Sequence, residues 1–360
     1  MMRTIQISDL KMMLIERIDE LARELAPDGV RRGAEWVPRN PTRGDRRRGS
    51  FVIRVAGPKI GSFVEYADDA RGDVIDLIAY LVCGARKTPP TRAERIQAFA
   101  WARQWLGLEQ MTRADVARAR RASEARLADA RAREEVEALR RRGRARMIFL
   151  EAQQPIEGTL VDVYLASRGI ELKRIAHREH SLRFAPRLTH WLEPHVGPAM
   201  VAIFRNPRGS PTAVHVTWLR EDGRGKADVE KPKMMLGQVA GAVIRLSKGP
   251  TGLTPEEHAA AKALPGCCCL TEGIEDGLTA ALACPEYRCW AAGSLGNLAQ
   301  VPGLACVSDW VVCADNDWDK PAARRLFRQA VRAIEDLRRG PVGVARSWVG
   351  KDINDLLRAS

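Results

Sequence analysis

The feature that most constrains the fold is an alternation of short apolar runs with helical patterns at the C-terminal end of the sequence. Strands that alternate with helices pair in parallel, and the helices cover both faces of the resulting sheet. We therefore expect an α/β domain over residues 266–360. The apolar runs are 267–271, 288–292, 310–314 and 342–345, and the helical patterns are 274–283, 321–337 and a short one from Asp352.

Acidic residues follow two of these runs directly. Glu272 comes after the first run, and Asp315 and Asp317 come after the third. Functional groups gather at the carboxyl ends of parallel strands, and the Asp-x-Asp spacing sends two side chains to the same side. Three carboxylates in one cleft repel each other unless a cation neutralises them, and oxygen ligands favour Mg²⁺ or Mn²⁺ over zinc. The pattern predicts a site for phosphoryl transfer.

The basic residues are unevenly distributed. The 360 residues carry a net charge of +13, yet residues 266–360 hold 11 basic and 12 acidic residues. Residues 31–60 hold 9 basic and 2 acidic residues, with Arg46, Arg47 and Arg48 in one loop. An excess of this kind favours a polyanionic partner, most simply nucleic acid. For the Arg-rich stretch 112–147, solvated helix faces and a GC-rich genome explain the basic residues as well as a nucleic-acid partner does.

Several classes of protein are excluded by what the sequence lacks. It contains no apolar run long enough to cross a membrane, so no membrane partner is expected. Without a secretory leader, the eight cysteines indicate reduced thiols in the cytoplasm. The phosphate-binding loop of helicase motors is also absent, so any replicative helicase would be a separately encoded partner.

Three motifs in order resemble the Toprim domain, the catalytic fold of bacterial-type primases, of type IA and II topoisomerases and of some nucleases. The resemblance covers residues 266–358 and implies that Glu272, Asp315 and Asp317 bind the metal ions. Glu272 would also act as acid or base, Asp276 is the second acid of the first motif, and Asp355 would complete the metal shell. The motifs are Thr271-Glu272-Gly273, Ala314-Asp315-Asn316-Asp317 and Gly350-Lys351-Asp352-Ile353-Asn354-Asp355. A family glycine after the second motif is replaced by Asp319-Lys320. The alternative to a metal site is that these acidic residues cap helices and form turns on an ordinary α/β sheet.

Residues 151–265 are similar to the basic α+β subdomain that precedes Toprim in primases. That resemblance implies that Lys233 contacts nucleoside triphosphate or the single-stranded DNA template, unless it is an ordinary loop lysine. Further basic residues would neutralise phosphates, namely Arg168, Lys226 and Lys231.

Residues 1–110 resemble the zinc-ribbon region of primases, but the Cys and His ligands of that family are absent. We expect a small degenerate unit that binds nucleic acid through its basic loop, with no zinc. Residues 111–150 are expected to form a connecting helix because they contain few large apolar side chains.

Three functions remain open. The first is metal-dependent primer synthesis on single-stranded DNA, for a phage, plasmid or mobile element. The second is a Toprim nuclease that uses the same carboxylates. The third is a non-catalytic DNA-binding adaptor of a replication complex, which the loss of the zinc ligands favours and the intact acids oppose.

Overall fold

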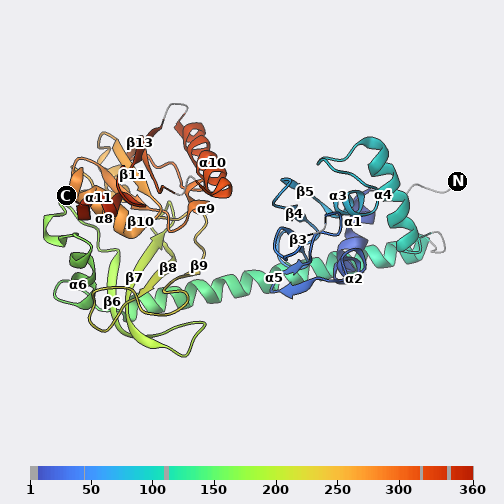
Figure 1. Cartoon of the computed structure of the whole chain (residues 1–360), viewed down its shortest axis with the longest axis horizontal. Helices are drawn as coiled ribbons and strands as arrows, with labels where there is room; N and C mark the ends of the chain where they lie inside the picture. The colour runs from blue at the N-terminus through green and yellow to red at the C-terminus, as the bar shows by residue number, and fades with distance from the viewer. Residues whose placement is uncertain (1–6, 44, 109–112, 317–318, 339–341, 360) are drawn as a thin grey trace. The chain divides into compact units, whose positions relative to one another are not determined.

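The computed structural model describes residues 7–43, 45–108, 113–316, 319–338 and 342–359 (Figure 1). The chain divides into two compact units, residues 1–137 and residues 138–360, which are described separately here. None of the helices in the described residues is both long and apolar enough to cross a membrane.

The first unit is a five-stranded antiparallel sheet packed against four helices. The apolar spacing of residues 8–25 predicts a single helix, and this prediction is wrong in one respect, because the backbone of Arg17 leaves helical geometry and divides the helix in two. The elements are α1 (Ile7–Glu16), α2 (Ile18–Leu25), β1 (Val30–Arg32), β2 (Glu35–Val37), β3 (Phe51–Arg54), β4 (Phe63–Glu65), β5 (Ala70–Gly72), α3 (Val74–Leu81) and α4 (Arg92–Trp105).

Aromatic packing fixes the sheet of the first unit to its helices. The rings of Phe51 on β3, Phe63 on β4 and Tyr80 on α3 lie 5.5–5.9 Å apart between centroids, and all three are buried. The side chain of Asp73 caps α3 by accepting hydrogen bonds from the backbone of Ile75 and Asp76. Such a cap stabilises a helix by about 1 kcal/mol.

Helix α5 (Arg113–Glu151) begins in the first unit and ends in the second. Its sequence carries no continuous apolar stripe, and its exposed middle is rich in arginine and glutamate. Near its end, Ala145 and Phe149 are buried in one cluster with Trp218.

Residues 152–237 form an antiparallel sheet and a helix that pack against the C-terminal domain. One face of this sheet packs on the end of α5, and the other joins a core shared with α6 and α8. The elements are α6 (Leu160–Ser167), a single 3₁₀ turn (Leu172–Arg174), β6 (Leu182–Thr189), β7 (Val196–Arg205), β8 (Pro211–Trp218) and β9 (Lys233–Gly237), with strand order β6-β7-β8-β9.

The C-terminal sheet has the order β10-β12-β11-β13-β14, and the last four of these strands are parallel to each other. This confirms the expected mixed α/β fold with a parallel C-terminal sheet. One strand was not expected, because β10 precedes Gly266 and adds antiparallel to β12. The elements are β10 (Ile244–Lys248), α7 (Pro255–Ala261), β11 (Gly266–Thr271), α8 (Ile274–Ala283), β12 (Arg288–Ala291), α9 (Leu295–Leu298), β13 (Val307–Ala314), α10 (Pro321–Arg338), β14 (Gly343–Arg346) and α11 (Ile353–Ala359).

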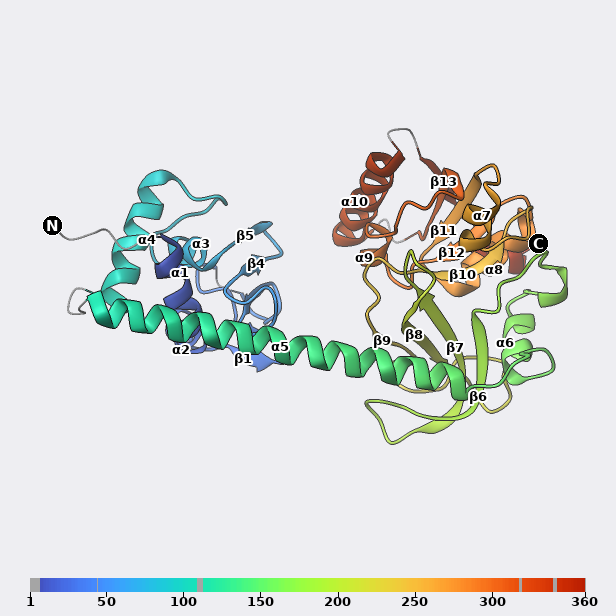
Figure 2. The same cartoon turned by 180° about the vertical axis from the view of Figure 1, so that it is seen from behind.

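Helices cover both faces of this sheet, and α8 and α10 lie on opposite sides of it (Figure 2). Consecutive residues of β11 alternate between the two cores, so Cys269 packs with α8 and Cys268 packs with α10. All eight cysteines are free thiols, and most are buried, as expected for a reduced core.

Asn297 joins three backbone segments beneath the sheet edge. Its amide nitrogen donates to the carbonyls of Ala242 and Ala292 at 2.8 and 2.9 Å, and its oxygen accepts from the backbone of Gly241. We predict that Asn297→Ala lowers the free energy of unfolding by about 2–3 kcal/mol, because buried polar groups lose their partners. Urea denaturation measures this change. The control Gln300→Ala, at a neighbouring exposed position, should change the free energy of unfolding by less than about 0.5 kcal/mol. Equal losses in the two variants would contradict a stabilising role for the Asn297 hydrogen bonds.

Candidate catalytic site at the carboxyl edge of the C-terminal sheet

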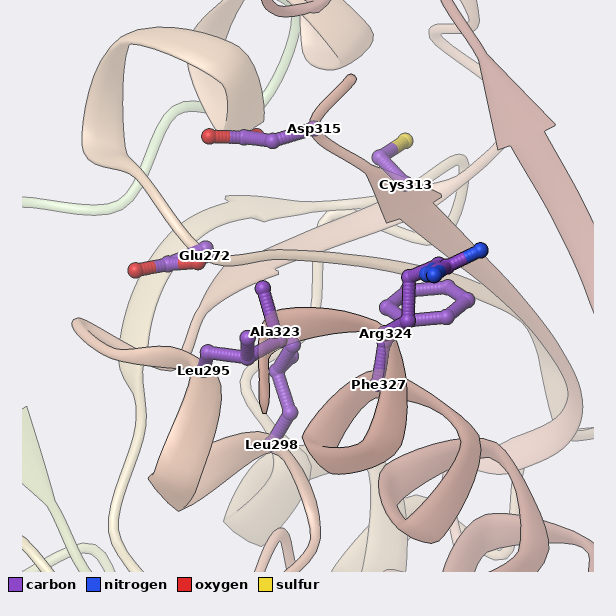
Figure 3. A pocket seen from close by; sticks show the side chains of 8 residues that line it. All are labelled: Glu272, Leu295, Leu298, Cys313, Asp315, Ala323, Arg324 and Phe327. Atoms are coloured by element: carbon purple, nitrogen blue, oxygen red, sulfur yellow. The ribbon is translucent and has the colours of Figure 1, made fainter. Parts of the chain in front are cut away.

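Two carboxylates enter one pocket from neighbouring strands. Glu272 directly follows β11 and Asp315 directly follows β13, and these strands pair in parallel with Leu270 opposite Val312. Figure 3 shows both carboxylates pointing to the same side of the pocket. Apolar and basic side chains complete its wall, namely Leu295, Leu298, Cys313, Ala323, Arg324 and Phe327.

The donor chemistry of this pocket suits a hard divalent cation. Carboxylate oxygens are the ligands that Mg²⁺ and Mn²⁺ prefer, and two carboxylates in one cleft need a counter-charge. The predicted third ligand, Asp317, lies outside the described residues. Within the residues that are described, no three His, Cys, Asp or Glu side chains form a group that could hold a metal ion.

Asp276 lies one helical turn beyond Glu272, in the first turn of α8. It is buried, and its carboxylate accepts a hydrogen bond of 3.0 Å from the backbone of Asn354. Burial raises the pKa of Asp276 to about 7, and the negative charges of Asp352 and Asp315 contribute to the rise. Negative charge is therefore concentrated at this edge of the sheet, as a cation site requires.

The closing motif folds into a tight turn in front of the pocket. Gly350 has a φ of +65°, and a Cβ there would lie only 2.5 Å from the Cβ of Asp355. Asp355 accepts a hydrogen bond from the backbone of Lys351 at 2.8 Å, and Asp352 accepts one from the backbone of Asp355 at 2.9 Å. The ammonium of Lys351 lies 3.9 Å from the Asp315 carboxylate. Asp355 thus shapes the turn, and its proposed place in a metal shell stays a prediction.

Two asparagines that the sequence analysis did not single out hold this turn in position. The Asn316 amide donates to the carbonyls of Ser347 and Gly350 at 3.0 and 2.9 Å. The buried Asn354 amide donates to the Arg168 carbonyl at 2.9 Å, across 186 residues of sequence. Both asparagines lie inside the quoted motifs, which was the available signal for their importance.

A buried ion cluster surrounds Glu275, three residues beyond Glu272. Glu275 on α8 accepts a hydrogen bond of 2.6 Å from Tyr164, and its carboxylate lies 3.2 Å from Lys233 and 3.5 Å from Lys226. Burial alone would raise the pKa of Glu275, but the two lysines outweigh it and hold that pKa well below its ordinary value. Burial lowers the pKa of Lys226, and the nearby charge of Lys233 adds to this effect. The structure thus brings together two of the predicted phosphate-binding lysines around an acid with no predicted role.

Arg168 lies beside this cluster, because it ends α6 with its guanidinium 6.0 Å from the centroid of the Tyr164 ring. The other predicted basic residues lie elsewhere, and Lys231 is exposed before β9. In the first unit, the side chains of Arg46, Arg47 and Arg48 are exposed on one loop. The guanidinium of Arg48 donates to the Asp28 carbonyl at 2.7 and 3.0 Å.

Comparisons with known proteins agree with the motifs at the sheet edge. Residues 267–360 match the Toprim domain family, and residues 139–246 match a domain of unknown function, DUF7146. The C-terminal segment is therefore a Toprim domain, which confirms the resemblance found in the sequence. No curated protein matches the chain.

Solved structures with similarity to this chain include three primases. The zinc-binding and RNA polymerase domains of the Aquifex aeolicus primase share 14% identity, with a TM-score of 0.36 over 98% of this chain and 82% of theirs. The primase fragment of the bacteriophage T7 primase-helicase shares 17%, with a TM-score of 0.35 over 54% and 67%. A DNA primase domain from Pseudomonas aeruginosa shares 14%, with a TM-score of 0.40 over 61% and 75%.

The ion cluster makes a prediction about stability. Glu275→Gln leaves two lysines without their counter-charge, so we expect a loss of about 2–4 kcal/mol in the free energy of unfolding. This range lies below that of fully buried pairs because the lysine side chains are 27% and 35% exposed. The exposed Glu286→Gln is the control and should change the free energy of unfolding by less than about 0.5 kcal/mol.

The same variant makes a prediction about pH. A carboxyl whose pKa is lowered on folding stabilises the fold above its ordinary pKa, about 4.3, and loses that stabilisation as the pH falls below it. The difference in stability between wild type and Glu275→Gln should therefore shrink between pH 6 and pH 3 in urea denaturation. If the difference in the free energy of unfolding between the two proteins stays constant with pH, Glu275 is not stabilised as a carboxylate by the two lysines.

Proposed function

We propose that this Toprim protein is a DNA primase-type nucleotidyltransferase that synthesises short primers on single-stranded DNA. The observation that carries the proposal is the pair Glu272 and Asp315, which enter one pocket from neighbouring parallel strands. In the proposed reaction a 3′-hydroxyl attacks the α-phosphate of a nucleoside triphosphate, a new phosphodiester bond forms and pyrophosphate leaves.

Mg²⁺ or Mn²⁺ is the proposed cofactor, held by Glu272 and Asp315 together with Asp317. When bound, such an ion supplies the positive charge that stabilises the reacting phosphate and its leaving group. The chain contributes the carboxylates at fixed strand ends, and the hydrogen bonds from Asn316 hold the closing turn at Ser347 and Gly350 next to Asp315. Glu272 is the proposed group that accepts or returns a proton.

The lysine cluster supports a role in binding nucleotides rather than in cutting a strand. Lys226 and Lys233 come from the segment before the Toprim domain, and their ammonium groups form ion pairs with Glu275, three residues beyond Glu272. A carboxylate that fixes two ammonium groups in position before the substrate binds lowers the entropic cost of binding a triphosphate, because the lysine side chains are already ordered. We propose that these lysines contact the nucleotide or the template.

The biological setting belongs to the same proposal. We infer action in the cytoplasm during replication of a phage, plasmid or other mobile element, alongside a separately encoded helicase. The basic loop at Arg46 and Arg47 would hold the template from the first unit.

The catalytic role of the pocket is tested by Asp315→Asn. Removing this carboxylate should lower primer synthesis at least about 1,000-fold, because several kcal/mol of charge stabilisation are lost. Labelled nucleoside triphosphates, single-stranded DNA and Mg²⁺ or Mn²⁺ are incubated with the protein, and the products are separated by length. Affinity for DNA should remain within about threefold.

Asp309→Asn is the matched control, since Asp309 is exposed on the same strand, β13. It should synthesise primers at the wild-type rate. If wild type shortens the template and makes no new product, the protein is a nuclease. If wild type binds DNA and gives neither product, it is a non-catalytic adaptor.

The basic loop makes a separate prediction for DNA binding. Arg46→Glu combined with Arg47→Glu should weaken binding to single-stranded DNA and make the slope of log affinity against log salt shallower by about 1.4 or more. Fluorescence anisotropy of a labelled oligonucleotide measures both. The pair Lys87→Glu and Arg92→Glu changes the charge of the same unit equally at other exposed positions and serves as the control. An unchanged salt slope would exclude this loop from the interface.

A further inference from the structure

A second hollow lies on the outer side of the Toprim domain, between α10 and the edge strand β14. It encloses about 360 Å³, which lies at the low end of the range for ligand pockets, roughly 300–1,000 Å³. Four arginines and one glutamate line it, above apolar side chains. The lining residues are Arg324, Phe327, Arg328, Val331, Arg332, Glu335, Val344 and Arg346.

Many basic residues of the Toprim domain are concentrated in this part of its sequence. Residues 266–360 contain 11 basic and 12 acidic residues, residues 324–346 alone contain seven basic and two acidic ones, and four of those seven line the hollow. The rest of the domain is therefore strongly acidic, and its acids include those of the pocket. A segregation of this kind separates a cation-binding edge from a surface that attracts phosphates.

The arrangement on α10 is unfavourable without a ligand. Arg324, Arg328 and Arg332 lie four residues apart, so their like charges repel along one side of the helix, and acidic residues one turn further on, Glu335 and Asp336, are placed to offset this only for Arg332. All three side chains are exposed, and none forms an ion pair with the described part of the chain. Bound anions would relieve this repulsion.

This hollow, the groove between α10 and β14, adjoins the acidic pocket. Arg324 and Phe327 line both hollows, and Figure 3 shows these two side chains in the lining of the acidic pocket. A chain-like anion that leaves the pocket along α10 would meet Arg324 first, and then Arg328 and Arg332.

The spacing favours a strand over a compact anion. Residues 324–332 span about 12 Å of helix, so their guanidinium groups can meet successive phosphates, whereas a triphosphate presents one compact cluster. The floor of Phe327, Val331 and Val344 offers apolar contact for sugars or bases, and Val344 is 41% exposed. Basic side chains along an apolar groove are typical of sites for single-stranded nucleic acid.

We propose that the groove between α10 and β14 is a binding site for single-stranded nucleic acid that adjoins the candidate catalytic pocket. It would hold the strand that enters or leaves the pocket. This inference rests on the proposed function for the role of the strand, but binding itself is measurable without catalysis.

The test is anisotropy of a fluorescein-labelled 16-residue oligothymidylate with the full chain. Arg328→Gln combined with Arg332→Gln should weaken binding about tenfold and make the salt slope shallower by about 1.4. The pair Arg328→Lys and Arg332→Lys keeps the charge and should retain most of the affinity. Arg325→Gln removes one charge from the same helix outside the groove, so it should change binding less than Arg328→Gln does.

Several outcomes would overturn the proposal. The first is an unchanged affinity and salt slope in the double variant Arg328→Gln and Arg332→Gln, called the Gln pair below. The second is a loss of affinity in the double variant Arg328→Lys and Arg332→Lys that equals the loss in the Gln pair. Competition by ATP that disappears in the Gln pair would assign the groove to nucleoside triphosphate instead. If the Gln pair binds the oligonucleotide normally while wild type synthesises primers, the assignment of the groove is wrong and the proposed function stands. If the Gln pair loses binding while wild type makes no primers, the proposed function is wrong and the assignment of the groove stands.

Discussion

The parallel pairing of β11 with β13 is the constraint on which the candidate site depends. Parallel strands place their carboxyl ends at one edge, so the residues that follow them, Glu272 and Asp315, share a pocket although 43 positions separate them. Buried apolar side chains on both faces fix this register, because a slip by one residue would exchange the two cores. The acids are thus held close together by the packing of residues that take no part in chemistry.

Polar contacts extend this order to the segments around the sheet. Asn316 holds the turn before α11, and Asn354 ties that helix to the end of α6. Glu275 connects α8 to lysines that precede the Toprim domain. These contacts join residues of the preceding segment to the C-terminal domain near the acidic edge, while the candidate pocket itself is lined by residues of the C-terminal domain. A buried polar group that lacks its partner is costly, which makes these contacts specific as well as stabilising.

Much of the C-terminal domain was predictable because its sequence pattern is local. Apolar runs and helical patterns located its parallel strands and helices within a few residues, and the order of the acids located the edge where they meet. Strand β10 could not be predicted, because its partner β12 lies 40 residues further along the chain. The pairing of Lys233 with Glu275 was hidden for the same reason, since it depends on tertiary packing between α8 and β9. The break at Arg17 was missed because apolar spacing continues through it.

That Glu272 and Asp315 together hold a divalent ion is tested most directly by Mn²⁺ binding to the full chain. Electron paramagnetic resonance measures free Mn²⁺ during a titration of wild type, Glu272→Gln and Asp309→Asn. We expect a saturable site in wild type and in Asp309→Asn, and its loss in Glu272→Gln, because one carboxylate cannot replace two. Equal Mn²⁺ affinity in wild type and Glu272→Gln would contradict a metal centre at this edge of the sheet.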